Sequence, residues 1–120
     1  MVSTRNVVRE KSFLFAVRIV KLARHLQHDH KEYVLSKQLT RAGTSIGANI
    51  EEALAGQSRR DFIAKMSIAS KEARETQYWI RLLIASGYLN SERTAETTLQ
   101  MHCDELIRLL TSIVKTSQEN

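Results

Sequence analysis

Apolar residues recur at spacings of three and four along most of the chain, in four segments separated by polar breaks at residues 27–32, 56–58 and 87–91. Residues three and four apart share one face of an α-helix, so each segment is predicted to form an amphipathic helix. The expected helices span about residues 5–27, 33–55, 59–86 and 91–117. The apolar positions that define their faces are Val8, Phe15, Ile19, Leu22 and Leu26, then Leu35, Leu39, Ala42, Ile46, Ile50 and Ala53, then Phe62, Met66, Ala69, Ala73, Ile80 and Leu83, and finally Leu99, Cys103, Leu106, Leu110 and Ile113.

Residues at the breaks have the properties of helix ends. Ser58 and Asp61 have the spacing of a capping box at the start of the third helix. Gly87 can adopt the left-handed conformation that closes a helix, after which the chain packs back on the preceding turn. Asn90 or Ser91 is expected to cap the fourth helix.

Long helices with short connections predict an all-α fold, an up-down-up-down antiparallel four-helix bundle. The 120 residues suit one domain, over residues 1–120. The chain has no proline and only four glycines, which disfavours an all-β fold with its many turns. A single cysteine, Cys103, excludes an intramolecular disulfide.

Two glycines inside the predicted second helix need a reason, because each costs about 0.8–1 kcal/mol relative to alanine. Gly43 and Gly47 share one face, which favours close approach of a neighbouring helix of the same chain or, alternatively, of another subunit. Asn49 lies beside apolar positions of the same helix. We expect it to be a structural hydrogen-bonding residue, since a buried amide without partners costs about 1–3 kcal/mol.

The second and third segments carry a recognisable combination of motifs. Residues 39–53 read LTRAGTSIGANIEEA and contain the pattern Arg-Ala-x-x-Ser-Ile-x-Ala-Asn-Ile-x-Glu. SRRDF follows at residues 58–62, KEARETQYW at 71–79 and GYL at 87–89. In these motifs the chain resembles the four-helix-bundle proteins related to those encoded in intervening sequences of bacterial 23S ribosomal RNA genes, and the resemblance covers nearly the whole chain.

The resemblance implies an assembly and partners. It implies a barrel-like homopentamer of bundles, and kinship with the accessory variability protein of diversity-generating retroelements. That relative is a basic pentamer that associates with a reverse transcriptase and with nucleic acid. A reverse transcriptase or another protein is therefore an expected partner by resemblance.

The sequence offers no basis for enzymatic chemistry. A di-metal carboxylate centre in a helix bundle needs Glu-x-x-His motifs, whereas Leu22 and Leu99 occupy the positions three residues before His25 and His102. No nucleophile motif or dinucleotide fingerprint is present, and Cys103 lies on an apolar face as a small hydrophobe. We therefore expect a non-enzymatic protein with no metal and no cofactor.

Polar and aromatic residues of the third helix are expected to serve structure or assembly. In a hairpin of the second and third helices, Arg41 lies opposite Glu75, which predicts an ion pair; a charged groove for a ligand is the alternative. Tyr78 and Trp79 are about 100° apart on the helix, so they cannot both face the core. At least one of them is available for a subunit contact.

The first helix is too apolar for a surface helix, because Phe13, Ala16, Val17 and Val20 add a second apolar face to the first. Two apolar faces favour packing against a partner chain. The observation predicts a homo-oligomer independently of the resemblance, although it does not predict the number five.

The net charge of +5 is unevenly distributed. Residues 1–41 contain nine Lys/Arg and three Asp/Glu, and residues 42–120 contain nine and ten. Arg59 and Arg60 begin the third helix, where they either cover the carbonyls that end the second helix or contact phosphate. The residues predicted to bind an RNA or DNA backbone are Lys11, Arg18, Lys21, Arg59 and Arg60.

The alternative function is a scaffold that binds another protein, with the basic residues as a solvated face. The absence of an apolar stretch long enough for a bilayer predicts no membrane partner, and no targeting pattern is recognisable. The expected location is therefore the cytoplasm.

Overall fold

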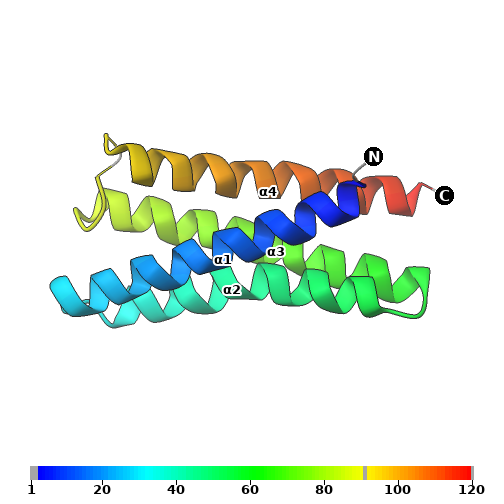
Figure 1. Ribbon diagram of the computed structural model, residues 1–120, viewed down its shortest axis with the longest axis horizontal. Coiled ribbons are helices and arrows are strands. Elements are labelled where there is room, and N and C mark those ends of the chain that lie inside the picture. Colours follow the sequence, from blue (N-terminus) through cyan, green and yellow to red (C-terminus); the bar gives the residue numbers. More distant parts are fainter. Residues whose placement is uncertain (1–2, 91, 120) are drawn as a thin grey trace.

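The computed structural model describes residues 3–90 and 92–119, which form four long helices (Figure 1). They are α1 (Thr4–Asp29), α2 (Val34–Ala55), α3 (Arg59–Ala85) and α4 (Thr94–Gln118). Consecutive helices run in opposite directions, as Figure 1 shows. The helices pack in a ring, in which α1 contacts α2 and α4, and α3 contacts the same two helices. This arrangement agrees with the predicted up-down-up-down order.

The predicted apolar faces meet in one core. Its fully buried side chains come from all four helices and include Phe15, Ile46, Met66 and Leu110. Leu22 and Leu35, at the edges of their faces, are only partly buried and pack against this core. Burial of apolar area is the main favourable term in folding, so the spacing of these side chains directly determines which face of each helix points inward.

Two of the predicted helix ends are confirmed. Ser58 Oγ accepts a hydrogen bond from the backbone N–H of Asp61 at 3.0 Å, and α3 begins at the next residue. Gly87 has a φ of +86°, and the backbone N–H of Tyr88 and of Leu89 both donate to the carbonyl of Leu83. Leu89 then packs into the core, as expected for a helix that ends at such a glycine.

The predicted start of α4 is wrong. The helix begins at Thr94, with Arg93 at the capping position and no side-chain hydrogen bond there. Asn90 does not cap the helix, because its Oδ1 accepts from the backbone N–H of Glu92 two residues later. This local bond extends the connection beyond the predicted break, and Ser91, the alternative cap, lies outside the described residues.

Candidate nucleic-acid interface

The start of α1, the turn between α2 and α3, and the end of α4 share one end of the molecule (Figure 1). Two cations in the first half of α1 have acidic partners on other helices. Arg9 Nε lies 2.7 Å from Glu51 Oε2 on α2, and Lys11 Nζ lies 3.1 Å from Glu105 Oε1 on α4. Exposed pairs of this kind contribute little to stability. Each carboxylate nevertheless cancels the positive field that a phosphate would need.

Two further predicted phosphate ligands make contacts within the fold. Arg18 has one guanidinium nitrogen 2.8 Å from His102 Nδ1, and the other donates to the carbonyl of Ala95 at 2.7 Å. Arg59 Nε donates to the carbonyl of Ser117 at 3.0 Å, in the last turn of α4. Arg59 therefore covers a carbonyl at the end of α4, a favourable place for a cation, whereas one of the two expectations placed it over the carbonyls that end α2.

The five residues predicted to bind phosphate do not form one surface. Lys21 and Arg60 are exposed and make no ion pair or hydrogen bond with any part of the chain that the structure describes. Arg5, at the start of α1, lies over the Phe62 ring at 4.2 Å from its centroid. Arg60 lies two residues before Phe62 and is therefore near the start of α1. The 16 residues from Arg5 to Lys21 span about 24 Å of helix. Lys21 and Arg60 thus belong to opposite halves of the molecule.

A different surface concentrates positive charge, and none of its Lys or Arg side chains forms an ion pair within the described residues. Residues 18–37 contain five Lys/Arg and two acids, for a net charge of +3, together with three His. Exposed side chains follow the outer face of α1, cross the turn and continue on α2. Within residues 3–90 and 92–119, Lys21, Arg24 and Lys37 have no carboxylate at ion-pair distance. This turn surface is defined by Lys21, Arg24, His28, Lys31, Tyr33 and Lys37.

The sequence prediction included Lys21 but missed the rest of the turn surface. A charge balance over residues 18–37 alone would have indicated the turn surface. The prediction missed it because the charge of residues 1–41 was summed as a whole. Counting charges along the sequence cannot show which cations form ion pairs with acids from other helices. Arg9 and Lys11 lie beside acids from other helices, whereas Arg24 and Lys37 have no carboxylate at ion-pair distance among the residues that the structure describes.

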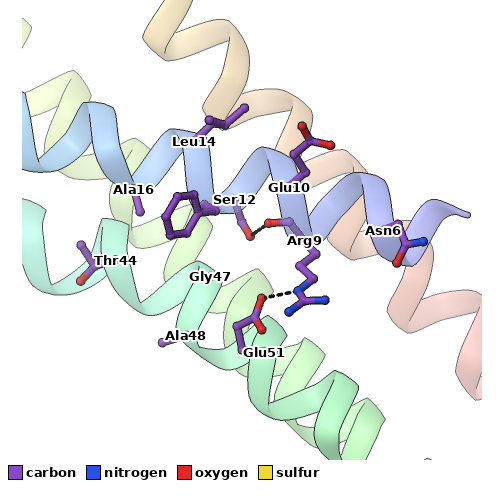
Figure 2. Close-up of a pocket in the computed structure, with 11 residues that line it drawn as sticks. Asn6, Arg9, Glu10, Ser12, Leu14, Ala16, Thr44, Gly47, Ala48 and Glu51 are labelled. Atoms are coloured by element: carbon purple, nitrogen blue, oxygen red, sulfur yellow. Dashed lines mark hydrogen bonds and ion pairs between the residues drawn. The ribbon is translucent and has the colours of Figure 1, made fainter. Parts of the chain in front are cut away.

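The second apolar face of α1 is open to solvent. Phe13 is 68% exposed, Leu14 55%, Val17 37% and Val20 40%. We call these four residues the outer apolar face. Beside it lies a groove of about 850 Å³ between α1 and α2, whose floor includes Ala16, Thr44, Gly47 and Ala48 (Figure 2). The Arg9–Glu51 ion pair spans one end of this groove.

The two internal glycines of α2 face α1 of the same chain. A Cβ at Gly43 would lie 2.8 Å from Ile19 Cγ2, closer than side chains pack. A Cβ at Gly47 would lie 3.4 Å from Ser12 Oγ, which is ordinary contact. Close approach of a neighbouring helix is therefore the role of Gly43, and that neighbour is α1, so the other-subunit alternative does not apply to it.

Comparison with known proteins identifies the family. A family model for the 23S rRNA-intervening sequence protein matches residues 4–112. The chain belongs to this family. Among solved structures, a protein of unknown function from the S23 ribosomal protein family of Bacteroides thetaiotaomicron is 50% identical to it. That structure superposes with a TM-score of 0.89 over 94% of this chain and 99% of the other. No curated protein matches.

The 23S rRNA-intervening sequence family motif in α2 builds a polar link to α3. Arg41 Nη1 lies 3.2 Å from Glu72 Oε2, and Arg41 Nη2 contacts Glu75 Oε2. Trp79 Nε1 donates to the same Glu75 oxygen at 3.0 Å. The predicted Arg41–Glu75 ion pair is thus present, and it extends into a cluster that couples the middle of α2 to α3.

Other residues singled out in this family member have structural contacts. The half-buried Asn49 donates through Nδ2 to the carbonyl of Ser45 at 2.8 Å, one turn earlier in α2. Tyr78 is 54% exposed, whereas Trp79 packs against the core. Burial raises the pKa of the Cys103 thiol to about 12, and its Sγ lies 3.5 Å from the carbonyl of Ala73.

The family member has no described helix with both the length and the apolar character that crossing a bilayer requires. Within the described residues, no three His, Cys, Asp or Glu side chains are arranged to hold a metal ion.

Proposed function

We propose that this member of the 23S rRNA-intervening sequence family is a non-enzymatic, homo-oligomeric accessory protein that binds the phosphate backbone of RNA or DNA. The turn surface carries the proposal. Neutralisation of phosphates by Lys and Arg supplies most of the affinity of sequence-independent binding, because it releases counterions. Lys21, Arg24 and Lys37 have no ion-paired carboxylates among the described residues, so their charges are available to phosphates.

The outer apolar face supports the homo-oligomeric part of the proposal. Contiguous exposed apolar residues on a small protein mark interaction sites, and Phe13 and Leu14 are each more than half exposed. The family resemblance suggests five copies. An oligomer would repeat the turn surface once per copy, and several weak phosphate contacts on one nucleic acid would then act together.

The binding experiment compares two variants with the same change in charge. Fluorescence anisotropy with a labelled RNA hairpin and a DNA duplex is measured between about 50 and 200 mM salt. Lys21→Gln/Lys37→Gln removes two turn-surface cations, and Lys71→Gln/Lys115→Gln removes two exposed cations from other surfaces. We expect the first variant to lower the salt slope by about 2 per binding subunit and the second to change it little. Equal losses in both variants, or no binding at the lowest salt, would overturn the proposal.

The assembly experiment uses the outer apolar face. Leu14→Gln/Val17→Gln is expected to shift the mass measured by native mass spectrometry from an oligomer to a monomer. Val34→Gln is the matched control, because Val34 is 71% exposed but lies outside that face. A wild-type protein that is monomeric at micromolar concentration contradicts the homo-oligomeric part.

A protein-binding scaffold is the second candidate function, and the groove between α1 and α2 favours it. Its volume of about 850 Å³ and the apolar part of its lining, which includes Phe13, Leu14 and Ala16, could receive side chains of a partner protein. The two functions predict different results in the binding experiment. A scaffold keeps its oligomeric state but binds neither RNA nor DNA in a salt-dependent way.

A further inference from the structure

The turn between α1 and α2 contains an open cleft of about 520 Å³. Its lining includes cationic and imidazole side chains from the last turns of α1, and Tyr33 from the turn. Tyr33 is 52% exposed although it is a large aromatic residue. The lining residues are Arg24, His25, Gln27, His28, Lys31 and Tyr33.

The backbone around Tyr33 is held in place on both sides. Lys31 adopts the left-handed conformation with a φ of 54°, and the backbone N–H of Glu32 donates to the carbonyl of Leu26 at 3.0 Å. Glu32 Oε1 then accepts from the backbone N–H of Ser36 at 2.8 Å. The turn is therefore closed by hydrogen bonds before and after Tyr33, so the backbone that carries its exposed ring is held in place.

The charges around the cleft are mixed, and the cations predominate. Asp29 is a lining neighbour, but its carboxylate contacts His25 Nδ1 at 2.7 Å and His28 Nδ1 at 3.2 Å. Glu32 is used in capping α2. Lys31 Nζ donates to the carbonyl of His28 at 2.9 Å, which offsets the negative end of the α1 dipole. Arg24 lines the cleft without an ion pair within the described residues, and Lys21 and Lys37 flank it on α1 and α2.

An exposed aromatic ring next to cations that have no ion pair in the described residues suits one class of nucleic acid. The bases of a duplex are stacked on one another and cannot reach a protein ring, whereas the bases of a single strand or loop can. Stacking of a base on an aromatic side chain contributes about 1–3 kcal/mol, while nearby Lys and Arg contact the phosphates on either side. The volume of the cleft lies within the range of sites for small organic groups.

We propose that the α1–α2 turn cleft binds an unstacked base of single-stranded nucleic acid, with Tyr33 as its stacking platform and Arg24 and Lys31 beside the adjoining phosphates. The inference rests on the proposed function and deepens it. It assigns a strand class, single-stranded or looped, where the charges of the turn surface alone predict binding to any phosphate backbone.

The test compares single-stranded and duplex probes on the whole protein. Anisotropy is measured with labelled oligouridylate of about 12 nucleotides, within the range of single-strand sites, and with an RNA duplex of the same length. Tyr33→Ala is expected to weaken binding of the single strand by about 5- to 150-fold and to leave duplex binding unchanged. Tyr33→Phe keeps the ring and is expected to retain the wild-type affinity. Melting curves followed by circular dichroism verify that each variant is folded.

The outcomes separate this inference from the proposed function. If Tyr33→Ala binds both probes as tightly as the wild type, or loses both equally, Tyr33 is not a stacking platform and the inference is overturned. The proposed function survives that result as long as Lys21→Gln/Lys37→Gln still weakens binding. If the wild-type protein binds neither probe at low salt, both proposals are overturned.

Discussion

Gly43→Ala is the substitution that tests the packing of α1 against α2 most directly. The new Cβ would lie 2.8 Å from Ile19 Cγ2 and 2.9 Å from Ile19 Cγ1. Ile19 is fully buried, and both contacted atoms are attached to its Cβ. A β-branched side chain in a helix has one strongly preferred rotamer, so neither atom can swing aside without moving the backbone.

Two effects of opposite sign determine the result. Replacing glycine by alanine inside a helix stabilises it by about 0.8–1 kcal/mol. Forcing an extra methyl group into a close-packed core costs typically about 1–3 kcal/mol. We therefore expect Gly43→Ala to lower the free energy of unfolding by about 0.5–2 kcal/mol.

Gly47→Ala is the matched control, one turn further along the same face. Its Cβ would meet Ser12 Oγ at 3.4 Å and the Ser12 carbonyl oxygen at 3.6 Å, both normal contacts. The helix-propensity gain then remains, and the free energy of unfolding should rise by about 0.5–1 kcal/mol. The two glycines are thus predicted to differ in sign.

Urea denaturation followed by circular dichroism measures both variants at one protein concentration, because oligomer stability depends on concentration. With a slope of about 2 kcal/mol per molar urea, 1 kcal/mol moves the midpoint by about 0.5 M. In an Ile19→Ala background the two closest atoms, Cγ2 and Cγ1, are gone and only the Cβ contact at 3.3 Å remains, so most of the cost of Gly43→Ala should disappear. Gly43→Ala that stabilises the wild-type background as much as Gly47→Ala does would refute this account of the close approach.

Three further predictions concern the turn, the core and the charge of α1. Lys31→Gly relieves the strain of the observed φ of 54°, about 1–2 kcal/mol, and loses the bond from Nζ to the His28 carbonyl, about 0.3–1 kcal/mol at a helix end. The free energy of unfolding should therefore rise by about 0.5–1 kcal/mol in the same urea assay; a loss of stability would contradict this. Cys103, whose pKa is raised to about 12 by burial, should react with a disulfide reagent at pH 8 about 10³-fold more slowly in the native protein than in urea, since only the thiolate reacts; equal rates would show an accessible thiol. The hydrogen bond from His28 lowers the pKa of the Asp29 carboxyl, so its stabilising effect should be present above the ordinary value of about 3.9 and be lost as the pH falls below it. The difference in melting temperature between the wild type and Asp29→Asn should accordingly be largest above this pH and shrink as the pH falls through the lowered pKa of Asp29, and a constant difference would exclude this origin.

The fold follows from local properties of the chain to a large extent. The spacing of apolar side chains determines which face of each helix is buried, and this is why the positions around Phe15, Ile46 and Leu110 were predicted correctly. Ser58 and Gly87 mark helix ends through bonds within a few residues. The start of α4 was mispredicted because Asn90 can bond either a helix N–H or the N–H two residues on, and only the folded connection selects between them.

The register of two antiparallel helices was also accessible from the sequence. Counting outward from the α2–α3 turn brings Arg41 opposite Glu75, and the two side chains are in contact. The partner of Gly43 was not accessible in this way. A small residue indicates that another helix approaches closely. That the approaching residue is Ile19 of α1 depends on how the helices pack together.

The amino-acid sequence by itself determined four helices, their buried faces, their order and a basic first third of the chain. Only the tertiary structure decided which of those basic residues remain available. These contacts depend on the distance between side chains from different helices. Lys11 forms an ion pair with Glu105, and Arg18 contacts His102. Among the described residues, the same packing left Lys21, Arg24 and Lys37 without carboxylate partners, and it left Tyr33 exposed near them.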